Sequence, residues 1–142
     1  MLYLVLIING SIIYIYRENN SIADAIADIA ARHNCIHWQI DDNSLINVTA
    51  IKLMFDGSAG KSALGYVPAS GVVLFVARGQ CGVWTQSAHL SVPLPPTSTS
   101  MFAETISGLL AILLARWILN NPSFPTTDQI KEMIAVHVVS PH

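Results

Sequence analysis

Two acidic residues stand where their carboxylates could take part in chemistry. Asp56 ends the apolar run Ile51–Phe55, which is typical of a strand, and glycine and serine follow it at once. Glu104 lies near the start of a long apolar segment that is typical of a buried helix. A carboxylate fixed at the end of a strand suits a metal site, because Mg²⁺ prefers hard oxygen ligands. The two residues predict such a site if the fold brings them together.

The residues after Asp56 also match part of a phosphate-binding loop. Gly60-Lys61-Ser62 reproduces the end of the pattern G-x-x-x-x-G-K-[ST]. That loop needs a glycine where this chain has Phe55, and it needs a helix that begins at the lysine. More glycines, a proline and a valine-rich run follow, and these indicate a hairpin. We expect a turn between antiparallel strands here.

A further group of potential ligands lies in a polar, aperiodic stretch, residues 33–44. His33, Cys35 and His37 alternate there, but a fourth ligand at a zinc-site spacing is missing, so the stretch predicts a loop. Cys35 and Cys81 lie far apart and form no C-x-x-C motif, which favours free thiols in a reducing compartment. We expect an intracellular location, cytoplasmic or nuclear.

The composition sets limits on partners. With 142 residues the chain is about one domain long, and it is 52% hydrophobic and only 11% charged, against roughly 25% charged in ordinary globular domains. Its solubility can therefore depend on an oligomer or on a larger parent protein. Seven basic residues against nine acidic ones give a net charge of -2. No overall basic field attracts nucleic acid, so any such contact must be local.

The N-terminal residues predict strands. Leu2–Ile8 and Ile12–Tyr16 flank Asn9-Gly10, which favours a tight hairpin turn, and one long bent strand is the alternative. The whole run is apolar enough to suggest a membrane or signal segment. It lacks a basic flank and is shorter than the ~20 residues that span a bilayer, so we expect no membrane insertion.

Two helices and a meander account for most of the rest. Ser21 begins a helical pattern that ends at Arg32 and carries Asp24 and Asp28 one turn apart. A second helix runs from Ser100 through Ile118, and its apolar circumference must be mostly buried. The predicted strands between the helices are Ile46–Phe55, Gly65–Pro68, Gly71–Ala77 and Cys81–His89. A last short helical pattern passes through Ile130, Met133 and Ile134. An α/β domain results.

Several of these segments resemble the ribonuclease H family, particularly the domains attached to retroelement reverse transcriptases. The segments that resemble the first half of that fold are Phe55-Asp56-Gly57-Ser58, Gly71-Val72-Val73-Leu74, Ala103-Glu104 and Gly108-Leu109-Leu110-Ala111. The segment that resembles its closing strand and helix is Arg17-Glu18-Asn19-Asn20-Ser21-Ile22-Ala23-Asp24-Ala25-Ile26-Ala27. The resemblance implies a mixed sheet, an antiparallel meander plus parallel strands, with flanking helices.

The resemblance also implies a set of four carboxylates that hold two divalent metals. The strand-end aspartate matches Asp56, the glutamate of the first helix matches Glu104, and the aspartate entering the final helix matches Asp24. Asp128 is the best match for the remaining aspartate, although the serine that usually follows it is absent. The implied cofactor is Mg²⁺, with Mn²⁺ as an alternative, and the implied reaction is hydrolysis of the RNA strand of an RNA–DNA hybrid.

The order of the segments departs from the family. Residues 1–34 resemble the closing strand and helix, residues 35–45 form a linker, and residues 46–142 resemble the first half. Either the chain is one circularly permuted domain, or it joins the tail of one module to the head of another. The expected function is a nuclease. The alternatives are a catalytically inactive interaction module of a retroelement polyprotein, or a small membrane-associated protein.

Overall fold

One mixed sheet with a helix on each face makes up the fold. The computed structural model describes residues 7–8, 14–16, 21–78, 83–120 and 132–139. The elements are β1 (Ile7–Ile8), β2 (Tyr14–Tyr16), α1 (Ser21–His33), β3 (His37–Ile40), η2 (Asp42–Leu45), β4 (Ala50–Ser58), η3 (Ser62–Leu64), β5 (Ala69–Ala77), β6 (Thr85–Pro93), α2 (Ser100–Leu119) and β7 (Glu132–Val139). This confirms the α/β class that the sequence predicts.

Four strands form an antiparallel half of the sheet in the order β4, β5, β6, β3. The first three form a meander, because β4, β5 and β6 follow one another in the sequence and each pairs antiparallel with the next. Both faces of β4 and β5 are covered, so these strands are nearly continuous apolar runs. The predicted meander is confirmed, and β3 extends it.

The other half of the sheet lies beyond β4. β7 pairs with β4 in the parallel direction, from Ala50 opposite Glu132 to Phe55 opposite His137. The two short N-terminal strands both pair with β7, β1 antiparallel and β2 parallel. Among the described residues they do not pair with each other, which differs from the predicted hairpin.

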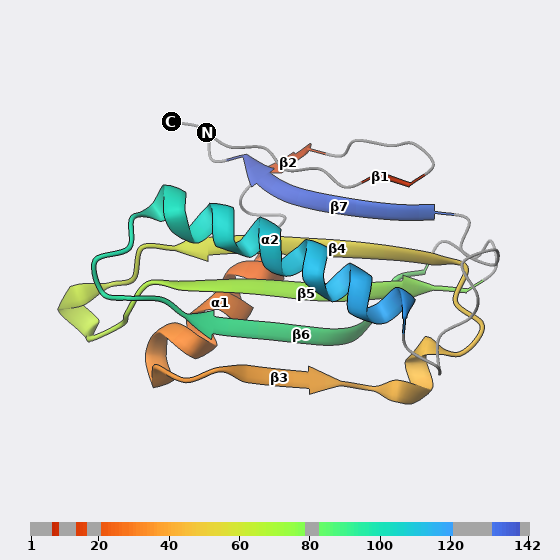
Figure 1. Cartoon of the computed structure of the whole chain (residues 1–142), viewed down its shortest axis with the longest axis horizontal. Helices are drawn as coiled ribbons and strands as arrows, with labels where there is room; N and C mark the ends of the chain where they lie inside the picture. Colours follow the sequence, from red (N-terminus) through yellow and green to blue (C-terminus); the bar gives the residue numbers. More distant parts are fainter. Residues whose placement is uncertain (1–6, 9–13, 17–20, 79–82, 121–131, 140–142) are drawn as a thin grey trace.

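The helices lie on opposite faces, as Figure 1 shows, with α2 in front of the sheet and α1 behind it. Alternate residues of β4 point to the two faces. Phe55 packs in the cluster that contains Leu114 of α2, whereas Met54 packs with Ile26 of α1. Each helix therefore closes its own hydrophobic core against the same central strands.

The α2 helix begins as the sequence predicts. The Thr99 side chain accepts a hydrogen bond from the backbone N–H of Phe102 at 3.1 Å, a standard N-cap. The segment Ser100–Ile118 is long and apolar enough to cross a membrane, although 39% of it is buried within the fold. Residues of α2 that face the sheet, such as Ala111 and Ile118, are buried, whereas Leu109 and Leu113 are 48% and 59% exposed. The expectation that most of the helix circumference is buried is therefore wrong.

Three predicted elements are wrong. The loop expected over residues 33–44 contains β3, an edge strand whose polar sequence gives little strand signal. The last helical pattern is instead the strand β7, because a short apolar run fits either period and the edge of β4 offers a pairing partner. The strand expected at Gly65–Pro68 is replaced by a tight turn, in which Gly65 adopts a φ of 73° after η3. No α-helix begins at Lys61, so the phosphate-loop interpretation fails there.

Candidate functional site

Asp56 lies inside β4 rather than at its end, two residues before the strand stops at Ser58. It is 8% exposed, and its Oδ1 accepts a hydrogen bond from the backbone N–H of Gly57 at 2.9 Å. Its register partner on β5 is Gly71, so the two side-chain positions share the face that α1 covers. A short polar side chain is thereby held on a rigid, central strand.

The next residue brings β4 against α2. A Cβ built on Gly57 would lie 2.2 Å from the carbonyl carbon of Ala103 and 2.3 Å from the nitrogen of Glu104. The buried Ser70 hydroxyl donates a hydrogen bond to the Ala103 carbonyl oxygen at 2.7 Å and fixes the same turn of the helix. The half-buried Glu104 is therefore held beside the Asp56-Gly57 peptide.

A second glycine brings α1 to the opposite face. A Cβ on Gly71 would lie 2.5 Å from the backbone nitrogen of Ala27 and 3.1 Å from the carbonyl oxygen of Ala23. The turn of α1 between these alanines carries Asp24, which is half buried. Gly71 is the register partner of Asp56. The turn of α1 that carries Asp24 therefore lies over the strand next to that of Asp56.

Asp56 is thus the point at which the early turns of two helices approach the sheet from its two faces. The backbone brings Asp56, Glu104 and Asp24 to one region, but Asp56 and Asp24 share one face whereas Glu104 arrives from the other. Within the part of the chain that the structure describes, no three His, Cys, Asp or Glu side chains are grouped to hold a metal ion.

Asp128 lies outside the described residues. The strand that follows it, β7, begins at Glu132 opposite Ala50 and reaches the neighbourhood of Asp56 only at His137, which lies opposite Phe55. Ala50 is six residues from Asp56 along β4, about 20 Å at the usual rise of a strand. The start of β7 is therefore remote from the other three carboxylates.

The cation nearest to this region along β4 is Lys52, which belongs to the same face as Asp56 because the two are four residues apart on one strand. Its Nζ lies 4.7 Å from the centre of the Trp84 ring and 5.2 Å from that of Phe75. Burial lowers the pKa of this amine from its usual value of 10.5. Lys52 therefore contacts aromatic rings while it remains partly exposed.

Two histidines that are far apart in the sequence form a pair in the fold. His37 of β3 and His89 of β6 face each other with 2.9 Å between Nδ1 and Nε2, and their rings are within 9° of parallel. Burial, and then the neighbouring His37, lower the pKa of His89 below its usual 6.5. The strand pairing that joins them is long-range, and only the alternation of His33, Cys35 and His37 drew attention to this stretch.

A small polar hollow of about 160 Å³ lies beside His89, where β3 meets β6. Asp41 and Ser87 line it, and the Ser87 hydroxyl shares a short hydrogen bond with that of Ser44. His37 and Asp56 lie on strands that are three apart in the sheet, about 14 Å at the usual strand spacing. The hollow is therefore separate from the carboxylate region.

Comparison of the chain with protein-family models, with curated proteins and with solved structures finds no match. The functional assignment therefore depends on the residues and their arrangement.

Proposed function

We propose that this chain is a metal-dependent endonuclease of the ribonuclease H type, built as a circularly permuted domain. The observation that carries the proposal is the position of Asp56-Gly57. Gly57 lies against the turn of α2 that carries Glu104, and Gly71, the partner of Asp56, lies against the turn of α1 that carries Asp24. These are three of the four carboxylates that the resemblance assigns to catalysis.

The order of strands supports a permuted domain rather than two joined half-modules. The meander β4, β5, β6 is followed by α2 and then by β7, which pairs with β4. The segment that resembles the end of the family fold supplies β2, which pairs with β7, and α1, which packs on β4, β5 and β6. Both segments therefore complete a single sheet, and exposed loops tolerate such a change of termini.

The three carboxylates are suitable ligands for a divalent metal, and their backbones lie in one region. Their side chains do not all point to the same face of the sheet. Asp56, Glu104 and Asp24 offer the hard oxygen ligands that Mg²⁺ and Mn²⁺ prefer. When bound, such ions activate a water nucleophile and stabilise the leaving oxygen of a phosphodiester. The backbone of Glu104 lies on the other face of β4. Its carboxylate would have to extend past Gly57, which has no side chain, to bind the same metal as Asp56.

The residues of the chain contribute rigidity and orientation to this chemistry. The Gly57 N–H donates a hydrogen bond to Oδ1 of Asp56 and helps to fix the direction of this carboxylate on β4. The Ser70 hydroxyl and the Thr99 cap hold the first turns of α2, so Glu104 stands on a fixed element. Sites supported in this way keep the geometry that catalysis requires.

A catalytically inactive module of the same fold is the second candidate, and the register of β7 favours it. The register of β4 and β7 ends at the pair Phe55–His137, and its continuation by one residue would place Val138 beside Asp56. A valine cannot bind a metal. The fourth carboxylate would then have to come from Asp128. Four residues of extended chain place Asp128 at most about 14 Å from Glu132, and Glu132 itself lies at the end of β7 that is remote from Asp56.

The test is cleavage of a hybrid with a labelled RNA strand, in Mg²⁺ and in Mn²⁺. We expect cleavage by the wild type and a loss of about 100-fold or more in Asp56→Asn and in Glu104→Gln, since even indirect metal contacts are worth 10- to 100-fold. Asp42→Asn is the matched control, because Asp42 is an exposed acid in η2. Folded wild-type protein that cleaves with neither metal would reject the nuclease and leave the inactive module.

A further inference from the structure

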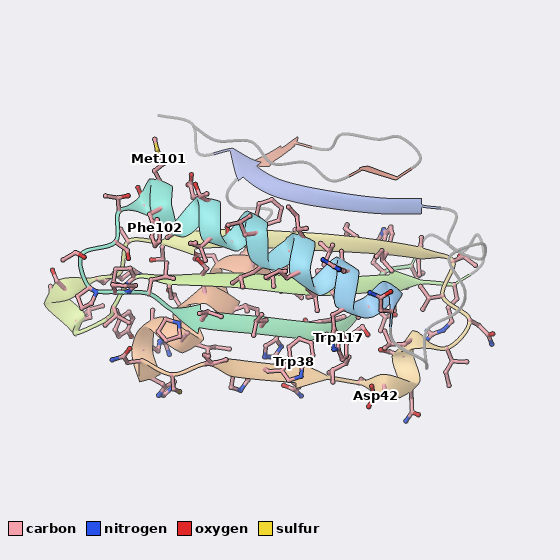
Figure 2. The ribbon with its side chains drawn as sticks, in the orientation of Figure 1. Trp38, Asp42, Met101, Phe102 and Trp117 are labelled. Atoms are coloured by element: carbon pink, nitrogen blue, oxygen red, sulfur yellow. The ribbon has the colours of Figure 1, made fainter. Side chains whose placement is uncertain are left out.

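The outward face of α2 is unusually apolar. A ridge at four-residue spacing, Met101, Thr105, Leu109, Leu113 and Trp117, runs along it. Its four apolar members are between 44% and 60% exposed, and Phe102 beside them is 45% exposed. Figure 2 shows Met101 and Phe102 at one end of the helix and Trp117 at the other.

The apolar face continues onto the edge of the sheet. The Trp38 ring of β3 meets that of Trp117 edge to face, with 5.5 Å between centroids, and Trp38 is 41% exposed. Together with Leu90, Leu113 and Leu114, the two tryptophans line an apolar hollow of about 340 Å³. One end of the ridge therefore carries Met101 and Phe102, and the other end borders this hollow.

The size of this face suits a protein interface. Six large apolar side chains, each exposing about 100 Å², or roughly half of what an aromatic side chain can bury, offer about 600 Å². A stable dimer buries about 800 Å² on each partner, including a polar rim. Monomers rarely expose apolar patches of this size without a function for them.

A second copy of the chain fits the ridge better than a lipid surface or a nucleic acid does. Helices that lie on membranes carry Lys and Arg beside their apolar face, whereas the only basic residue of α2 is Arg116. A nucleic acid is also a poor partner for this face, because its phosphates would find no other basic residue on α2. An uncharged ridge is complementary to itself, and a two-fold axis places the same patch on both partners.

We propose that the outer face of α2 is a homodimer interface, in which two α2 helices pack antiparallel about a two-fold axis at Leu109. In that arrangement Met101 of each copy faces the hollow between Trp38 and Trp117 of the other. Leu109 meets its own counterpart, and Thr105 faces Leu113. The proposal does not rest on the nuclease function.

The first experiment measures the molar mass of the full chain by sedimentation over a range of concentrations. We expect a dimer for the wild type, and a dissociation constant at least about 30-fold larger for Leu109→Arg, since charges of like sign would meet at the axis. Leu64→Arg is the matched control, because Leu64 is also a leucine of high exposure, 64%, but belongs to η3 and not to the ridge of α2. A wild type that stays monomeric at every concentration overturns the proposal.

The second experiment tests the antiparallel register. Leu113→Glu alone should weaken the dimer by about 10-fold or more, and adding Thr105→Lys should restore it by pairing unlike charges across the interface. Within one helix these positions are eight residues, about 12 Å, apart, so the pair cannot act locally. Failure of the double variant to recover contradicts the register. Flotation of monomeric wild type with phosphatidylcholine vesicles would assign the face to lipid and overturn the dimer.

Discussion

The backbone of Gly57 lies directly against the backbone of Glu104: a Cβ at Gly57 would lie 2.3 Å from the Glu104 nitrogen. This contact sets how closely α2 approaches β4, and it is made by the residue next to Asp56. Gly71 sets the approach of α1 on the other face in the same way. Two glycines therefore position both helices around one buried aspartate.

Replacing either glycine should destabilise the fold. In Gly57→Ala and in Gly71→Ala the added methyl group meets backbone atoms, which cannot rotate away, and we expect a loss of about 1–3 kcal/mol or more in the free energy of unfolding by urea. Gly65→Asn is the control, because the space there is open and asparagine tolerates a positive φ. Equal midpoints for all three variants would show that the helices do not depend on these contacts.

The Ser70 hydroxyl should matter more than its size suggests. Ser70→Ala leaves the buried Ala103 carbonyl without this donor, and we expect a loss of about 1–3 kcal/mol in unfolding free energy. The same change at the exposed Ser62 should stay within about 0.5 kcal/mol. A Ser70→Ala protein as stable as Ser62→Ala would mean that water replaces the hydroxyl.

Stability should fall in mild acid because of the histidine pair. The pKa of His89 is lowered in the folded state, so the unfolded chain binds more protons between that pKa and 6.5. The free energy of unfolding that depends on neutral His89 is fully present above pH 6.5. It declines as the pH drops below 6.5, and it stops changing below the pKa of His89 in the folded state. Urea midpoints at pH 7 and pH 5 measure this.

The variants identify the group responsible for that pH dependence. His89→Gln should flatten the difference between the two pH values, and His37→Asn should reduce it by removing the nearby charge and the hydrogen bond. His33→Asn, at an exposed position on α1, should leave it unchanged. An unaltered difference in His89→Gln would assign the effect to another group.

Asp24 and Asp28 provide a matched pair on one helix. Only Asp24 lies in the turn whose alanines contact Gly71, opposite Asp56. We expect Asp24→Asn to lower hybrid cleavage by about 10-fold or more and Asp28→Asn to leave it within about 2-fold. Equal rates in the two variants would remove Asp24 from the site and would favour a role in the helix alone.

Sequence patterns predict the elements whose burial follows a clear period. The apolar length of α2 and the spacing of Ala23, Ile26 and Ala30 in α1 define both helices. The strand β3 is not predicted, because His37–Ile40 forms a strand through long-range pairing with β6, which no local pattern reports. The strand β7 is predicted as a helix, because its apolar residues also fit a helical period.

The candidate site is predictable only in part. The resemblance points to Asp56, Glu104 and Asp24, and the fold brings their backbones to one region. Gly57 and Gly71 matter because each lies against helix residues that are 44 to 48 positions away in the sequence. No local sequence pattern reports such a contact. The pairing of His37 with His89 is hidden for the same reason.

The most direct test of the proposed site is Mn²⁺ binding followed by backbone NMR. Substoichiometric Mn²⁺ broadens signals near the ion, so we predict loss of the amide signals of Gly57, Glu104 and residues 23–27, with Asp42 unaffected. In Asp56→Asn this selective broadening should disappear. Broadening that is confined to the region of Asp41, or that leaves Gly57 and Glu104 sharp while affecting other acids, would contradict a shared metal site at Asp56.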